Sequence, residues 1–211
     1  MRIARRALRS AIVLLLVLSV WTGSAAAQET VSLRAEKVRD AIAEMKERAA
    51  EAPGDIEVVI ELGNLYYENN MYDQALATYL EVVEMDSTHV GGRLNLGSVY
   101  LDLARFDEAE RHFLAAARLD PESSMAYTNL GTAYYTSQRF PEAMDMVQRA
   151  LELDPDNVEA HFNFGVAFAD AYLFAEAIRE WEKVIELAPE SPVAQICREN
   201  VAMLEEYRSR Q

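Results

Sequence analysis

The sequence indicates an all-α protein made of stacked helical hairpins, because several residue types recur every 34 residues. Self-similarity at a fixed interval of this size means one structural unit packed on copies of itself. Within each unit the apolar residues have helical spacing. The recurring sets are Gly63, Gly97, Gly131 and Gly165; Tyr66, Tyr100, Tyr134 and Phe168; Ala75, Ala109, Ala143 and Ala177.

Residues 1–27 have the pattern of a secretory signal peptide. Four arginines precede an apolar run, and the small residues Ala25, Ala26 and Ala27 follow it. The run of about 11 residues is shorter than the roughly 20 that cross a bilayer. We expect cleavage after Ala27, export to the periplasm or the medium, and a mature chain that does not span a membrane. The alternative is an uncleaved anchor.

Residues 28–55 are expected to form a linker and one capping helix. Ala41, Met45 and Pro53 keep the phase of the second helix of a unit, so residues 32–52 look like half of a degenerate repeat. Residues 28–31 are expected to be loose.

Each later unit is expected to contain a helix A, a tight turn and a helix B. In the second unit, Leu96 and Tyr100 share one face of helix A, and Ala109 and Phe113 share one face of helix B. Helix B should end before Pro121, because the residue preceding a proline is disfavoured in helical conformation.

The four glycines lie in the middle of helix A, where each costs about 1 kcal/mol relative to alanine. A cost in helix stability that recurs at the same position of every unit predicts a close approach between helices A and B there. Large residues recur at two other phases and are interpreted as core: Tyr79, Phe113, Val147 and Trp181; Tyr72, Phe106, Phe140 and Phe174.

The motif Leu96-Gly97, Tyr100, Ala109, Phe113 and Pro121 resembles the tetratricopeptide repeat family. The resemblance implies a right-handed α-solenoid with capping helices at both ends. It departs from the family pattern at Ser87 (no closing proline) and at Val147 (no aromatic). The units it implies are 56–89, 90–123, 124–157 and 158–191, followed by a C-terminal capping helix over 192–211.

Composition excludes several classes of function. The formal net charge is −15, and loss of the four signal arginines makes it four units more negative. A shortage of lysine and arginine argues against nucleic-acid binding. The acidity favours a basic partner or serves only to solvate the surface. The single cysteine, Cys197, permits no internal disulfide; it either bridges two chains or is a small core residue, which we favour.

No catalytic or metal-binding pattern is present. His89, His112 and His161 lack ligand spacing, and no nucleophile or phosphate-loop motif occurs. We therefore predict no cofactor, no metal and no enzymatic activity.

The resemblance implies that helix A lines a concave groove in which a protein or peptide lies. Transfer of the family's groove positions gives apolar, aromatic and acidic residues but no lysine or arginine, which predicts no carboxylate-clamp ligand. Amides beside them can hold a peptide backbone. The candidate partner-binding residues are Ile60, Asn64, Tyr67, Leu94, Asn95, Leu101, Thr128, Asn129, Tyr135, Phe162, Asn163 and Asp170.

Apolar and aromatic groups ringed by acids suit a basic or neutral amphipathic segment. The leading hypothesis is therefore an exported, non-catalytic adaptor that binds another protein. The alternative is a structural component of a cell-envelope assembly that associates with itself. Individual groove residues could instead only space the helices or meet solvent.

Overall fold

A computed structural model describes residues 25–210, with side chains from residue 33 onward. Ten helices and no strand lie within this range, as the sequence predicted. They are α2 (Ala25–Glu51), α3 (Ile56–Glu68), α4 (Tyr72–Met85), α5 (Val90–Asp102), α6 (Phe106–Leu119), α7 (Ser124–Thr136), α8 (Phe140–Leu153), α9 (Val158–Asp170), α10 (Phe174–Leu187) and α11 (Pro192–Ser209).

The chain divides after Pro53 into two compact units, and α2 is the described part of the first. This helix begins at Ala25, so the prediction of a loose segment over 28–31 is wrong. No glycine or proline interrupts the helix between Ala25 and Glu51, so nothing there stops it. The predicted signal peptide lies outside the described residues except for its last three alanines.

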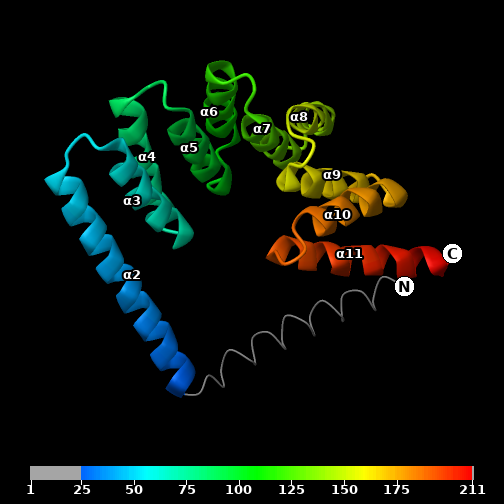
Figure 1. The fold of residues 1–211 in the computed structure, drawn as a ribbon, viewed down its shortest axis with the longest axis horizontal. Helices are drawn as coiled ribbons and strands as arrows, with labels where there is room; N and C mark the ends of the chain where they lie inside the picture. Colours follow the sequence, from blue (N-terminus) through cyan, green and yellow to red (C-terminus); the bar gives the residue numbers. More distant parts are fainter. Residues whose placement is uncertain (1–24, 211) are drawn as a thin grey trace. The chain divides into compact units, whose positions relative to one another are not determined.

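The second unit consists of four helical hairpins followed by α11. Figure 1 shows the pairs α3–α4, α5–α6, α7–α8 and α9–α10 succeeding one another, and α11 packs on α10. Helices α3, α5, α7 and α9 are the predicted helices A, and α4, α6, α8 and α10 are the predicted helices B. Helices α6 and α8 end at Leu119 and Leu153, two residues before Pro121 and Pro155. The expected hairpins and their proline stops are thus confirmed.

Side chains cap helices A but not helices B. Asp55, Ser123 and Asn157 each accept a hydrogen bond from a backbone N–H in the first turn of the following helix. At α5 the same role falls to His89, whose Nδ1 accepts from the N–H of Gly92 at 2.9 Å. Helices B have no side-chain cap, because each begins directly after the tight turn that ends helix A.

That tight turn places a residue in the left-handed region in every repeat. The residues are Asn70, Ala104, Gln138 and Tyr172, with φ between 56° and 64°. The carbonyl of Tyr100 accepts a 2.8 Å hydrogen bond from the N–H of Arg105, which closes the turn around Ala104. The bond satisfies a carbonyl that the helix end would otherwise leave unpaired.

The core lies between helix A and helix B of each hairpin. A Cβ on Gly97 would lie 2.5 Å from Cε1 of Phe113, and a Cβ on Gly131 would lie 2.6 Å from Cγ2 of Val147. Both glycines are buried, which confirms the predicted close approach. The aromatic ring or the valine occupies the space that a side chain on helix A would need.

Helix α11 covers the last hairpin through one face. Ala194 and Cys197 are fully buried, and Val201 and Leu204 pack on the cluster around Trp181. Ile196 lies on the same helix and is exposed. Burial raises the pKa of the Cys197 thiol to about 11. The position of Cys197 in the core supports its interpretation as a small packing residue.

The glycine contact can be tested by Gly97→Ala. We expect this variant to lower the free energy of unfolding by about 2 kcal/mol, because the ring of Phe113 must move to admit a methyl group. Gly91→Ala is the matched control: its Cβ would meet only the His89 side chain, at 3.3 Å. Urea unfolding followed by circular dichroism measures both, and equal effects of the two substitutions would contradict the close-packing explanation.

The left-handed turns predict a stabilising substitution. Ala104→Gly should raise the free energy of unfolding by about 1 kcal/mol, because glycine adopts positive φ without the steric penalty of alanine. Asn70→Gly should have a smaller effect, since asparagine tolerates this region. Thermal unfolding of both variants measures the difference, and destabilisation by Ala104→Gly would refute the explanation.

Candidate interaction groove

Successive helices A contact one another directly and form one continuous surface. Helix α5 contacts α7, and α7 contacts α9, whereas contacts between successive helices B are weaker. The helices A therefore lie on the inner side of the bend of this unit (Figure 1). This surface, formed by α3, α5, α7 and α9, is called the groove below.

Two equivalent hydrogen bonds join neighbouring repeats in the groove. The hydroxyl of Tyr67 donates to Oδ2 of Asp102 at 2.5 Å, and the hydroxyl of Tyr135 donates to Oδ2 of Asp170. The first bond joins repeats 1 and 2, and the second joins repeats 3 and 4. Between repeats 2 and 3 the same positions hold Leu101 and Thr136, which cannot form this bond.

The amides show the same alternation. Asn95 Nδ2 donates to Oδ1 of Asn64 at 3.3 Å, and Asn163 Nδ2 donates to Oγ1 of Thr132 at 3.0 Å. Asn129, which stands between them, is half-buried and has no hydrogen-bond partner among the described residues. We call the contact between two successive repeats a joint. The middle joint, between repeats 2 and 3, is therefore the one whose amide is free to bind another molecule.

Two of the twelve predicted contact residues point into the fold. Thr128 is 0 % exposed, and its hydroxyl donates to the carbonyl of Ser124 and accepts from Nδ2 of Asn157. Leu94 is 7 % exposed. Both side chains are buried, so we correct the prediction that they contact a partner.

The remaining ten residues have some accessible surface. Asn64 and Asp170 are exposed. Phe162 also packs against the core cluster around Trp181, whose Nε1 donates to the Phe162 carbonyl at 3.3 Å. Eight are intermediate between buried and exposed: Ile60, Tyr67, Asn95, Leu101, Asn129, Tyr135, Phe162 and Asn163.

The groove tyrosines are held in the protonated state by their surroundings. Burial, together with the hydrogen bond to Asp170, raises the pKa of Tyr135 to about 12. Burial and the Asp102 carboxylate raise the pKa of Tyr67 further. Both phenols are therefore neutral donors across the physiological range.

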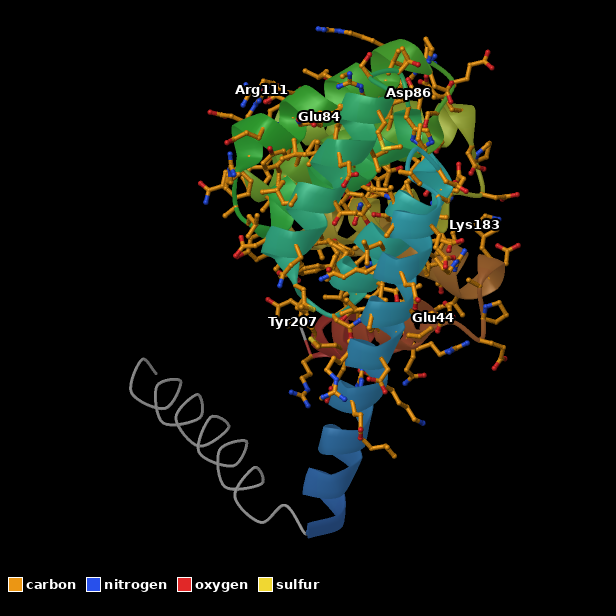
Figure 2. All side chains as sticks on the ribbon, turned by 90° about the vertical axis from the view of Figure 1, so that its left-hand side faces the viewer. Glu44, Glu84, Asp86, Arg111, Lys183 and Tyr207 are labelled. Atoms are coloured by element: carbon orange, nitrogen blue, oxygen red, sulfur yellow. The ribbon has the colours of Figure 1, made fainter. Side chains whose placement is uncertain are left out.

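Positive charge is scarce near the groove, and the arginines at its edge are already paired. Arg105 binds Oε1 of Glu108, and Arg139 binds Oε2 of Glu110 at 2.7 Å and Oε1 of Glu142 at 3.0 Å. Elsewhere in the repeats, charged side chains such as Glu84 and Arg111 project outward (Figure 2). The groove itself presents carboxylates, amides and apolar groups.

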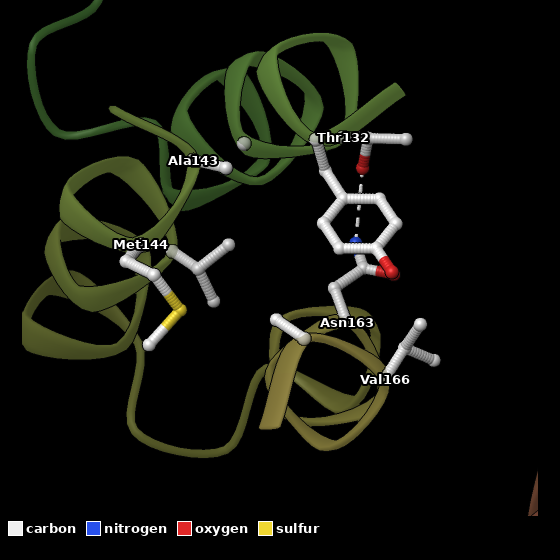
Figure 3. A pocket seen from close by; sticks show the side chains of 9 residues that line it. Thr132, Ala143, Met144, Asn163 and Val166 are labelled. Carbon is white, nitrogen blue, oxygen red and sulfur yellow. Dashed lines mark hydrogen bonds between the residues drawn. The ribbon is translucent and has the colours of Figure 1, made fainter. Parts of the chain in front are cut away.

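Two adjoining cavities lie where repeats 3 and 4 meet. The smaller, of about 40 Å³, lies among α7, α8 and α9 beneath the Asn163–Thr132 hydrogen bond (Figure 3). The larger, of about 270 Å³, extends from Tyr135 toward the turn after α9. Sequence reasoning missed its lining residues Phe140, Met144, Phe168 and Leu173. The available signal was Leu173, which stands in phase with Arg105 and Arg139.

The three histidines have structural surroundings. His89 caps α5, the ring of His112 stacks on Tyr100 at 5.4 Å, and His161 lies between Oε2 of Glu180 and the Pro155 carbonyl. Within residues 25–210 no three potential ligands converge on a metal site. None of the helices in that range has the length and apolarity needed to cross a membrane.

Two tetratricopeptide repeat family models match most of the chain. One covers residues 94–157 and 128–192, and the other covers residues 32–88. The chain therefore belongs to the tetratricopeptide repeat family. The fold is a protein-interaction fold rather than a catalytic one, which supports an interaction scaffold as the class of this protein.

Solved structures agree with this assignment. TTC0263, a thermophilic TPR protein of Thermus thermophilus, matches with a TM-score of 0.70 and 20% identity, over 84% of this chain and 95% of its own. MamA of Desulfovibrio magneticus RS-1 matches with a TM-score of 0.61 and 23% identity, over 77% and 92%. YrrB, described as a TPR protein with an unusual peptide-binding site, matches with a TM-score of 0.54 and 27% identity, over 78% and 84%. Comparison with curated proteins finds no significant match.

Tyrosine titration tests the Tyr135–Asp170 bond. A phenol in the unfolded chain ionises near pH 10, so the raised pKa of Tyr135 stabilises the fold below that pH, and this stabilisation is lost as the pH rises through about 12. The absorbance difference between the wild-type chain and Tyr135→Phe should place this phenol near pH 12. In Asp170→Asn its ionisation should move to lower pH, because the charged acceptor is gone. An unchanged titration in Asp170→Asn would contradict the assignment.

Proposed function

We propose that this chain is an exported, non-catalytic adaptor that binds a protein or peptide segment along the groove. The support comes from the family assignment and from the continuous surface that helices A present. YrrB, a structural relative described as having a peptide-binding site, adds a precedent for peptide binding on this fold. The residue pattern of 1–27 supports export, which places the adaptor in the periplasm or outside the cell.

The groove suits a basic or neutral amphipathic segment. Asp102 and Asp170 each accept one tyrosine hydroxyl, which leaves lone pairs on both carboxylates for a further donor. No lysine or arginine stands at the predicted groove positions, so a C-terminal carboxylate would meet like charge there. Complementary charge would speed the encounter with a basic partner.

The free amide of Asn129 is the observation that carries the proposal. The amides of Asn95 and Asn163 are engaged between repeats, whereas the Asn129 amide is not. An amide can donate to a peptide carbonyl and accept from a peptide N–H at once. Leu101 supplies an apolar contact at the same joint. A peptide segment centred on repeats 2 and 3 would form hydrogen bonds with the Asn129 amide and cover the Leu101 side chain.

Crosslinking pulldown from the native cell envelope tests this proposal. Asn129→Leu combined with Leu101→Arg should reduce partner recovery about tenfold, because it removes the free amide and places a like charge before a basic segment. Leu80→Arg, an exposed leucine on helix B, is the matched control and should leave recovery unchanged. Circular dichroism confirms that each variant is folded.

Two outcomes would argue against the adaptor. Equal recovery from the double variant and from wild type would reject the groove as the binding surface. Recovery of only this same chain, with light scattering showing oligomers at micromolar concentration, would favour the structural, self-associating alternative. We expect a monomer.

A further inference from the structure

An apolar pocket opens at the joint between repeats 3 and 4. Its volume of about 270 Å³ exceeds that of a single large side chain, and its only charged lining group is a carboxylate, that of Asp170. Three helices and one turn contribute to it. The lining residues are Tyr135, Phe140, Met144, Ala167, Phe168, Asp170, Ala171 and Leu173.

At the two preceding joints, an arginine occupies the position equivalent to Leu173. The guanidinium of Arg105 lies 4.6 Å from the ring centroid of Tyr100, and that of Arg139 lies 4.1 Å from that of Tyr134. Arg139 is fixed there by Glu110, which also accepts the Tyr134 hydroxyl at 2.9 Å. The arginine guanidinium groups cover the tyrosine rings and form hydrogen bonds with glutamate carboxylates.

The joint between repeats 3 and 4 lacks every part of this cover. Leu173 stands in place of the arginine, Phe168 in place of the tyrosine, and Met144 in place of Glu110. Ala171 also stands where repeat 2 has the larger Leu103. The result is an open apolar pocket at a position that the other joints close with a polar cluster.

The smaller cavity adjoins this pocket. Val147 lines the smaller cavity, at the position where the other repeats hold Tyr79, Phe113 and Trp181. Met144 lines both cavities, and its side chain lies beside the smaller one in Figure 3. An unbranched methionine is a deformable lining that adapts to an inserted group.

The mouth of the pocket exposes large apolar side chains together. Phe140 is 50 % exposed and Leu173 is 47 % exposed, and the neighbouring Tyr172 is 78 % exposed. Phe140 packs edge-on against Tyr135, at 5.4 Å between ring centroids. Apolar groups gathered around a concave site mark a place where another molecule binds.

We propose that this pocket takes an aromatic or large aliphatic side chain of the bound partner segment, with a basic residue of that segment beside it. Asp170 accepts the Tyr135 hydroxyl and pairs with no lysine or arginine among the described residues, so its charge is left for a cation from outside. The inference rests on the proposed function and specifies the anchor that the groove recognises.

Methyl NMR of methionine-labelled protein tests the pocket directly. The probes are acetyl-Lys-Phe-Lys-amide, acetyl-Glu-Phe-Glu-amide and acetyl-Lys-Ala-Lys-amide. The Lys-Phe-Lys peptide should shift the Met144 methyl signal saturably and leave Met125 and Met203, which are exposed elsewhere, unmoved. The other two peptides should bind at least about tenfold more weakly, since one repels Asp170 and the other lacks the anchor.

Two variants fill the pocket with residues that the chain already carries at equivalent positions. Leu173→Arg restores the residue type of Arg105 and Arg139, and Ala171→Leu restores that of Leu103. Each should weaken Lys-Phe-Lys binding about tenfold without loss of helicity. Leu119→Arg, at an exposed leucine of α6, is the matched control and should bind like the wild type.

The proposal is overturned if Met144 does not respond, if all methionines shift together, or if Leu173→Arg binds as tightly as wild type. Native pulldown separates this failure from that of the proposed function. Partner recovery that survives Leu173→Arg but is lost with the Asn129 and Leu101 double variant would retain the adaptor and reject the pocket. Recovery that survives both would reject the groove itself.

Discussion

The contact of a helix A glycine with a large helix B side chain underlies the whole structure. At Gly97 the ring of Phe113 lies where a side chain would stand, so the two helices approach closely along their length. Repetition of this contact in every hairpin gives units of the same thickness, and units of the same thickness can stack in register. Stability therefore comes from the stacked core, since a chain with a single, buried cysteine can form no internal disulfide.

Differences between the joints, rather than the repeat itself, create the candidate binding features. The tyrosine–carboxylate and amide bonds bridge the first and third joints, whereas the middle joint has Leu101 and an unengaged Asn129 amide. Arginine–tyrosine pairs cover the turns after α5 and α7, whereas the turn after α9 has apolar residues in their place. A uniform solenoid would offer the same surface at each step, so these departures distinguish one position along the groove from another.

In the proposed function, surface charge and short-range contacts have different roles. The acidic residues act over distance and favour the approach of a basic segment, although salt screens them. The free amide and the apolar pocket act only at contact, where desolvated groups supply most of the binding energy. In this proposal the acidic groove sets the class of partner, and repeats 2 to 4 supply the specific contacts.

The sequence by itself determined the hairpins, their boundaries and the packing role of the glycines. These features are local or repeat at a fixed interval, so helical periodicity, proline stops and the 34-residue step were sufficient to predict them. Ten of the twelve candidate groove residues have accessible surface on helices A, and their contact with a partner stays a prediction. The start of α2 was missed, because no residue there marks where the helix begins.

Only the tertiary structure decided which groove residues are accessible. Thr128 and Leu94 share the phase of Ile60 and Phe162, which are half-buried, yet Thr128 and Leu94 are buried. The structure likewise decided that Asn129 is free while Asn95 is bound, and that Leu173 and Ala171 line an open pocket. Each outcome depends on side chains from two or three helices that are distant in sequence, and a repeat pattern fixes the phase of a residue but not what its spatial neighbours are.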